Sequence, residues 1–428
     1  MRIGIIGSGI SGLATAFALA RSGHHVEVFE RDEAVGGLIA TCDLAGTRVE
    51  RYYHFLCGGD DGYFGLCRDL DLAGRLVFRK ARTGFYYEGV EYPFSTALDL
   101  LRFAPIPFSQ RLRFGVFALE SRTRQEWRQL DEIVAKPWLI DRIGRQAYEV
   151  VWEPLLAMKF GDSHDRISAA WVWHRLHRVA RSRGKLGYLR GGSGLLLDTL
   201  SAAIHAQGGA IHAGRPARAI AATSGRVRGI VLDGGEVFEC EHVVSTLPLP
   251  VTADLLPEEC RTYAESLRQV AYIGVVCATF KLDRPVTRNF WLNVHDSRLP
   301  FNGIIEYTNL NPIDAKAGHI VYVPYYVATD RAPYTEDDAT VFRRSWQTLQ
   351  TIQPGLRDES IVAYGLFRAP YAQAICPTGF LNTLPDVHAP LEGLHLVDST
   401  FLYPEDRTQS GLILRARACA EGIERHGA

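Results

Sequence analysis

No stretch of this sequence offers the ~20 uninterrupted apolar residues that a membrane-spanning helix needs. The nearest candidate, residues 3–20, is broken by four glycines. Neither a cationic stretch nor a cleavage site frames it, so it does not resemble a secretory signal. We therefore expect a cytoplasmic protein that at most touches a membrane surface.

Charge of one sign is not in excess either. The 428 residues include 47 Lys and Arg against 48 Asp and Glu, a net charge of −1. Without a basic excess, no nucleic acid partner is expected. The eight cysteines form no CxxC pair and do not cluster with histidine at zinc-ligand spacing. We therefore expect no metal site, and cysteines that are small buried side chains in a reducing cytosol.

Common catalytic motifs are missing as well. The sequence contains no GxSxG, no HExxH and no Walker lysine. It therefore gives no indication of a serine hydrolase, a zincin or a P-loop enzyme. Apolar residues make up 47% and charged residues 22%, ordinary values for a globular protein. Glycine is somewhat abundant at 40 residues, which directs attention to glycine-rich loops.

The first thirty residues contain such a loop in a specific setting. A short apolar strand, Arg2–Ile6, leads into Gly7-x-Gly9-x-x-Gly12, a helix to Arg21 and a second strand ending at Glu30. Gly7 permits the tight turn, Gly9 lets the backbone approach a pyrophosphate, and Gly12 allows close helix packing. The helix N-terminus around Ile10 and Ser11 offers N–H groups to phosphate, and Glu30 is placed to accept from ribose hydroxyls, with Arg31 beside it. A purely structural turn is the alternative for the hexapeptide alone, but its surroundings favour a dinucleotide site.

A second glycine pair follows directly, and it indicates which dinucleotide. Glu30 to Thr41 contains Gly36-Gly37-Leu38 and resembles the E-x-x-x-x-x-G-G-x-x-x-T pattern of the superfamily of monoamine oxidase, protoporphyrinogen oxidase and phytoene desaturase, which also contains UDP-galactopyranose mutase. The resemblance implies FAD as the cofactor, with Gly37 and Leu38 near it. Ala40 departs from the arginine that many relatives carry. Cys376 and Cys419 lie outside the motif that links flavin covalently, so the FAD is expected to be non-covalent.

The C-terminal segment carries a second family motif. A strand ends at Asp398, and a loop containing Arg407 precedes a helix expected over Leu412–Glu424. In relatives the aspartate accepts from the ribityl chain and the helix N-terminus faces the flavin, which implicates Asp398, Ser410, Gly411 and Leu412. Val397 replaces the usual glycine. The resemblance also places main chain near Ala217 against the adenine.

The expected fold class is α/β (α+β overall). A Rossmann-like FAD-binding domain is interleaved with a substrate domain of antiparallel sheet plus a helical cap. In the cap segment, prolines separate apolar stretches that we expect to be helices. Residues 272–368 are rich in aromatics and alternate between apolar and polar, which predicts the antiparallel sheet. Asp233-Gly234-Gly235 predicts a hairpin turn. The FAD-binding domain is expected in three parts, the substrate domain in two; the order along the chain is FAD-binding 1–74, helical cap 75–183, FAD-binding 184–250, antiparallel sheet 251–384 and FAD-binding 385–428.

Three residues are candidates for the reaction centre: Tyr53, His54 and Arg407. The segment around His54 follows the Gly36-Gly37 loop and, by the resemblance, passes beside the flavin. The unperturbed pKa of histidine, about 6.5, suits proton removal near neutrality. Core packing is the alternative for both Tyr53 and His54. Arg407 would favour an anionic reduced ring or bind an acidic substrate.

The expected function is an FAD-dependent oxidoreductase that takes hydride from a small-molecule substrate, such as an amine, an alcohol or a C–C bond. No second GxGxxG marks an NAD(P)H domain, so oxygen or another acceptor would reoxidise the flavin. A non-redox enzyme resembling UDP-galactopyranose mutase is one alternative, with Arg175, Arg178, Arg181 and Arg368 available for a nucleotide-sugar pyrophosphate. A catalytically idle FAD-binding protein is another. The resemblance also implies peripheral membrane contact through the helical cap, and the oligomeric state is left open.

Overall fold

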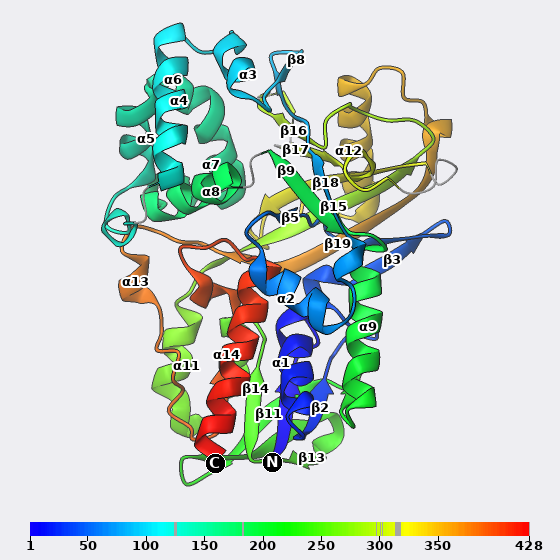
Figure 1. Ribbon diagram of the computed structural model, residues 1–428, viewed down its shortest axis with the longest axis vertical. Coiled ribbons are helices and arrows are strands. Elements are labelled where there is room, and N and C mark those ends of the chain that lie inside the picture. Colours follow the sequence, from blue (N-terminus) through cyan, green and yellow to red (C-terminus); the bar gives the residue numbers. More distant parts are fainter. Residues whose placement is uncertain are drawn as a thin grey trace.

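The computed structural model describes residues 1–123, 126–181, 184–296, 298–299, 301, 303–312 and 318–427. At its base lies a five-stranded parallel sheet whose strands come from three distant parts of the chain (Figure 1). Its order is β10 (Ala210–His212), β2 (His25–Phe29), β1 (Arg2–Ile6), β14 (His242–Ser245) and β20 (Leu394–Leu396). This order confirms the expected dinucleotide-binding fold.

Two layers cover the parallel sheet. Helices α1 (Ile10–Arg21), α9 (Gly192–Ala206) and α14 (Gln409–Gly427) pack on one face, and a three-stranded sheet covers the other. Alternation along β1 explains this: Ile3 and Ile5 pack with the helices, whereas Ile6 packs in the cluster that contains Ile230. The covering strands are β11 (Ala217–Thr223), β12 (Arg226–Leu232) and β13 (Val237–Glu239), and the predicted turn joins β12 to β13.

A seven-stranded sheet forms the second body and confirms the expected sheet of the substrate domain. All its neighbouring strands pair antiparallel except β16 and β7, and β17 and β16 lie between β18 and β7. In sheet order the strands are β19 (Ile361–Ala374), β15 (Tyr272–Leu282), β18 (His319–Val327), β17 (Gly303–Glu306), β16 (Trp291–Val294), β7 (Thr83–Tyr87) and β8 (Val90–Pro93).

Two local predictions are corrected here. The beginning of the 75–183 segment, expected to be helical, forms β6 (Leu76–Lys80), β7 and β8, because its β-branched and aromatic residues find strand partners elsewhere in the chain. The aromatic-rich stretch expected to be entirely sheet contains helix α12 (Asp338–Ile352). Asp337 caps that helix by accepting from the Thr340 N–H, a start signal that alternation concealed.

The helical cap stands beside this sheet, at the upper left of Figure 1. Its helices are α3 (Ala97–Arg102), α4 (Phe108–Thr123), α5 (Ala135–Ile143), α6 (Arg145–Ala147), α7 (Glu153–Phe160) and α8 (Ala169–Arg181). Smaller elements connect the bodies: β3 (Thr41–Leu44) with β4 (Thr47–Glu50), β5 (Leu56–Cys57) with β9 (Lys185–Leu189) and β6, and helices α2 (Asp61–Asp69), α10 (Leu249–Leu255), α11 (Arg261–Arg268) and α13 (Phe380–Thr383).

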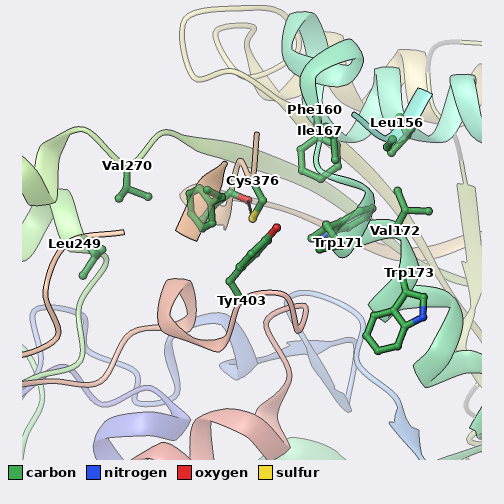
Figure 2. Close-up of a cluster of buried hydrophobic side chains, with 14 of the residues drawn as sticks. Leu156, Phe160, Ile167, Trp171, Val172, Trp173, Leu249, Val270, Cys376 and Tyr403 are labelled. Atoms are coloured by element: carbon green, nitrogen blue, oxygen red, sulfur yellow. Dashed lines mark hydrogen bonds between the residues drawn. The ribbon is translucent and has the colours of Figure 1, made fainter. Parts of the chain in front are cut away.

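One apolar cluster joins the cap to the loop before α14. Figure 2 shows Phe160 and Trp171 from α7 and α8 lying near Cys376 and Tyr403. The Tyr403 hydroxyl is not left unpaired in this cluster, since it bonds to Asp131 and to the Ser168 hydroxyl. Satisfied polar groups in an apolar contact hold the cap at a defined position over the loop that carries Arg407.

Candidate active site

The turn between β1 and α1 has the geometry that its glycines predict. Gly7 adopts φ +100°, which disfavours a side chain, and donates its N–H to Phe29 across 2.9 Å. A Cβ atom on Gly12 would lie 1.9 Å from the Gly7 carbonyl oxygen. A Cβ on Gly9, by contrast, would meet none of the described atoms within 4 Å. The backbone at Gly9 is therefore open for close approach by a ligand.

The second glycine loop lies directly beside the first. The Gly36 N–H donates to the Ser8 carbonyl across 3.0 Å, and Gly9 and Gly36 form an isolated bridge. Gly37 is so close that its Cβ would stand 3.4 Å from the Gly9 Cα. Two accessible glycine backbones, Gly9 and Gly37, thus form a cradle that fits a pyrophosphate, with Ile10 and Ser11 at the adjoining helix start and the half-buried Leu38 after it.

Glu30 lies at the end of β2, next to this cradle. Its carboxylate accepts from the Ser8 N–H at 2.9 Å, the Ser8 hydroxyl at 2.8 Å and the Asp32 N–H at 3.0 Å. These bonds hold the glycine loop, and each carboxylate oxygen can accept more than one bond, so ribose hydroxyls can be accommodated. Arg31 is exposed, with its Nε 3.5 Å from Asp32, and Ala217 opens β11 nearby, where Arg215 bonds to the Glu30 carbonyl.

The C-terminal motif comes to the same edge of the parallel sheet. Asp398 follows β20, and its Oδ1 accepts from the Thr400 N–H at 2.8 Å and the Tyr272 hydroxyl at 3.1 Å. Burial raises the pKa of this carboxyl. Helix α14 begins at Gln409, three residues before the predicted start, so Ser410, Gly411 and Leu412 form its first turn. The Ser410 hydroxyl accepts from the Gly62 N–H of α2 across 3.0 Å, which ties α14 to α2.

Tyr53, His54 and Arg407 lie together around one cavity. Its lining also includes Leu38, Tyr326 and Ala372, so this small cavity, about 20 Å³ in volume, lies between the second glycine loop and the antiparallel sheet. The Tyr53 and Tyr326 hydroxyls are 3.1 Å apart. Arg407 donates to the Tyr326 hydroxyl and to the Gln373 amide oxygen, both across 2.9 Å.

Protonation at this cavity differs from what isolated side chains would show. The His54 Nδ1–H donates to the Tyr52 carbonyl across 2.9 Å, a tautomer that leaves the Nε2 lone pair available. Burial, helped by the positive charge of Arg407, lowers the pKa of His54 to about 4. Burial also raises the pKa of Tyr53 well above its ordinary value. At neutral pH both side chains are therefore uncharged beside a permanently charged arginine.

Three further residues that the sequence did not single out, Lys159, Tyr326 and Asp406, lie beside this cavity together with Arg175, which was considered for a nucleotide sugar. Lys159 of α7 and Arg175 of α8 both reach the same Asp406 oxygen, at 3.4 and 3.3 Å. Tyr326 connects them to the cavity, with the Lys159 Nζ 5.4 Å from its ring centroid. Asp406 directly precedes Arg407, so its place near the site could have been predicted from the sequence. Lys159 and Tyr326 could not, because the residues they contact come from distant elements.

The remaining arginines considered for a nucleotide sugar are engaged elsewhere. Arg178 pairs with Asp60 across 3.1 Å, and Arg368 bonds to Asp338 and to the Tyr334 and Glu336 carbonyls. The Arg181 side chain lies outside the described residues. Of the three whose side chains are described, Arg175 is the one whose partner, Asp406, adjoins Arg407.

No group of three or more His, Cys, Asp or Glu side chains is arranged to hold a metal ion in the described part of the chain. Likewise, no helix among those residues is both long and apolar enough to cross a membrane.

A dinucleotide fold in which two glycine loops lie side by side, with an acid after β2 and a cavity beside a separate sheet, is the arrangement of a flavin-binding protein. The family model for flavin-containing amine oxidoreductases matches residues 10–389. The chain belongs to that family, which confirms the resemblance seen in its motifs and FAD as the cofactor.

Individual relatives are distant. The 15-cis-phytoene desaturase of Synechococcus elongatus is 23% identical over 319 residues, which cover 67% of this chain and 66% of the desaturase. The chain thus spans slightly less than two thirds of that relative's length. Among solved structures, putrescine oxidase with bound putrescine superposes with a TM-score of 0.76 at 16% identity, covering 99% of both chains. Reduced UDP-galactopyranose mutase also gives 0.76 at 16% identity, covering 99% of this chain and 94% of the mutase. These likenesses establish the fold.

Proposed function

We propose that this chain oxidises a small-molecule substrate held at the cavity lined by Tyr53, His54, Tyr326 and Arg407. When bound, FAD would supply the acceptor for a hydride from that substrate. The observation that carries the proposal is the cavity's position: it begins at Leu38, one residue after the pyrophosphate cradle, and ends at the antiparallel sheet. A ligand in the cradle and a ligand in the cavity would therefore be neighbours.

Different residues of the chain would bind the pyrophosphate, ribose, adenine and flavin parts of the cofactor. Gly7, Gly9, Gly12 and Gly37 keep the cradle free of side chains, and Ile10 and Ser11 present the start of α1 to phosphate. Glu30 and Arg31 lie on the ribose side, with Ala217 as the main chain near the adenine. Asp398, with Ser410, Gly411 and Leu412 at the start of α14, serves the flavin end.

Three side chains are proposed to act on the substrate. His54 is neutral at physiological pH and holds a lone pair on Nε2; because its pKa is lowered to about 4, it is a weaker base than the free imidazole expected from the sequence, and it would accept a proton only from a substrate group held directly against it. Tyr53 and Arg407 are connected through Tyr326, and Arg407 keeps its charge. The site therefore aligns a substrate against fixed hydrogen-bond donors while cap and sheet exclude water.

The test is anaerobic. Holoprotein is mixed with candidate amines, alcohols and compounds with saturated C–C bonds, and the visible flavin absorbance is followed. Bleaching by a substrate supports oxidation. Purified protein without FAD, or with FAD that no candidate class reduces, would count against it.

A mutase is the second candidate, favoured by Arg175, which pairs with Asp406 next to the cavity-lining Arg407. Turnover of a nucleotide sugar after dithionite reduction, without net flavin bleaching by that sugar, would support the mutase. An idle FAD-binding protein predicts neither bleaching nor isomerisation.

We also propose that the cap contacts a membrane surface, because helix α4 exposes a row of large apolar side chains. On α4, Phe114 and Phe117 face the core, yet Phe108, Leu112, Val116 and Leu119 are 47 to 61% exposed. Their spacing places the four on one outer stripe, next to the exposed Leu98 and Leu101 of α3. Exposed arginines Arg102 and Arg113 border it, which suits an anionic lipid surface.

Vesicle sedimentation tests this contact. The protein should sediment with vesicles containing anionic lipid, and Val116→Glu should release it, whereas Val362→Glu, at an exposed sheet position, should not. The eight cysteines are all free, which supports work in the cytosol. In fractionated cells we therefore expect the chain in cytosol and in the carbonate-extractable membrane fraction; its recovery from a secreted fraction would contradict this.

A further inference from the structure

Positive charge gathers on one side of the proposed substrate cavity. Lys159, Arg175 and Arg407 converge there from α7, α8 and the loop before α14, and Asp406 is the carboxylate they share. Lys159 and Arg175 bond to the same Asp406 oxygen, while the Arg407 side chain bonds to the Tyr326 hydroxyl and the Gln373 amide oxygen. Besides Arg178, which is paired with Asp60, three cations therefore face one carboxylate.

Nearby acids do not correct this imbalance. Asp60 is engaged with Arg178 and with the Cys57 N–H. Glu405 accepts from the Thr408 hydroxyl, and the charges acting on it are those of Arg178, Asp60 and Asp406. The charges that act most strongly on Lys159 are those of Asp406, Arg175 and Arg407, and neither Asp60 nor Glu405 is among them.

Burial makes the excess costly. The Lys159 side chain is 8% exposed, and its Nζ lies 5.0 Å from the Trp171 ring and 5.4 Å from the Tyr326 ring. Buried cations need a compensating partner. A 3.4 Å contact to a shared carboxylate is a weak one, and burial lowers the pKa of Lys159 to about 7.

The cluster reaches the cavity through Tyr326. Arg407 and Tyr326 line the cavity, and the Arg407 guanidinium lies 5.4 Å from the Tyr326 ring, the same distance as the Lys159 Nζ. An anionic group entering the cavity would meet Arg407 first, with Lys159 and Arg175 behind Tyr326 adding attraction. A cationic amine would be repelled, and a hydrocarbon would leave the charge uncompensated.

We propose that the substrate carries a carboxylate or phosphate group, bound at the Arg407–Tyr326 end of the cavity and stabilised by Lys159 and Arg175. This rests on the proposed function, since it concerns the same cavity. It separates this chain's substrate class from the putrescine bound by one structural neighbour and from hydrocarbon substrates.

The test uses FAD-loaded protein and four phenyl probes: benzoate, phenyl phosphate, benzylamine and benzyl alcohol. Each is titrated while the visible spectrum of the bound flavin is recorded. Benzoate or phenyl phosphate should perturb the spectrum at concentrations at least tenfold lower than benzylamine or benzyl alcohol. The stronger of the two anions distinguishes a carboxylate from a phosphate substrate.

Variants locate the binding. Lys159→Met and Arg175→Met should each weaken anion binding about tenfold or more while FAD content stays full. Lys136→Met is the matched control, since Lys136 lies in the same cap but pairs with Glu153 across 3.1 Å. Preferential binding of benzylamine or benzyl alcohol, or anion binding unchanged in both variants, overturns the inference.

The unmodified protein provides an independent measurement. Lys159 faces Asp406, Arg175, Arg407, Tyr326 and Cys376, and His174 lies near Asp406. With its pKa about 7, Lys159 changes charge near neutrality, whereas the pKa values of Asp406 and His174 are lowered and those of Cys376 and Arg407 are raised. Benzoate affinity should therefore fall severalfold as pH rises from about 6 to 8. Affinity independent of pH would count against Lys159. Protein without FAD would refute the proposed function itself, whereas full FAD without anion binding refutes this inference alone.

Discussion

The Arg407 guanidinium donates to the Tyr326 hydroxyl across 2.9 Å, and the same hydroxyl lies 3.1 Å from that of Tyr53. A residue of the loop before α14, a residue of β18 and a residue of the segment after the glycine loops thus meet at one oxygen. The position of Arg407 depends on both bodies of the fold. This dependence can be measured.

Tyr326→Phe should lower the free energy of unfolding by about 1.5–3 kcal/mol, because a buried guanidinium loses an acceptor. Tyr53→Phe removes a neutral partner only and should cost about 1 kcal/mol. Denaturant unfolding of the two variants measures the difference. Equal losses would show that Arg407 does not need the Tyr326 oxygen.

Two glycines of one motif should respond differently to substitution. Gly9 has φ −65°, which any residue adopts, and a Cβ there meets open space, so Gly9→Val should fold and yet lose FAD. Gly12→Val places carbon 1.9 Å from the Gly7 oxygen and should not fold stably. Circular dichroism and FAD content after acid precipitation distinguish the outcomes. If folded Gly9→Val protein retained a full complement of FAD, the pyrophosphate would not bind at Gly9.

Glu30→Ala should reduce FAD affinity by tenfold or more, since loss of a charged hydrogen bond costs roughly 1.5–3 kcal/mol. The structure adds a second reason: the Glu30 carboxylate also holds the Ser8 N–H and hydroxyl. Glu30→Gln keeps an acceptor and should lie between wild type and Glu30→Ala. Equilibrium dialysis of the apoproteins with FAD measures the affinity of wild type and both variants. Identical affinities in the three proteins would show that Glu30 does not bind FAD.

His54→Ala should slow flavin reduction by the true substrate about 10²-fold or more, with FAD content unchanged. His205→Ala is the control, because His205 bonds to the Gly209 carbonyl far from the cavity. Anaerobic stopped-flow absorbance gives the rates. A normal rate in His54→Ala would make His54 a packing residue.

The lowered pKa of His54 predicts a pH effect on stability. The unfolded chain binds this proton near pH 6.5 and the folded chain near 4, so between these values the unfolded state holds more protons. The His54 contribution to stability is thus present above pH 6.5 and is lost as pH falls toward 4. Unfolding free energies of wild type and His54→Ala at pH 7 and about 5 should therefore converge at the lower pH; a constant difference would contradict the shift.

Local motifs in the sequence were sufficient to predict the two glycine loops, the family and its FAD cofactor. The β1–α1 turn, the Gly36-Gly37 loop and the acid after β2 depend on backbone conformations that a few adjacent residues specify, so the fold class and the FAD-binding family could be inferred directly. Predicted element ends differed by a few residues, as at Gln409, because helix starts depend on caps that long patterns hide.

The structure around the proposed substrate cavity could not be predicted from local motifs. Leu76–Pro93 became strands because partners in distant segments outweighed local pattern, and α12 formed where alternating aromatics predicted sheet. The pairing of Lys159 with Asp406 joins residues 247 positions apart, and that of Arg407 with Tyr326 spans 81. Whether a lysine is a solvated surface charge or a buried cation beside a cavity depends on which elements pack against it, and packing arises only when the cap, the sheet and the last loop come together.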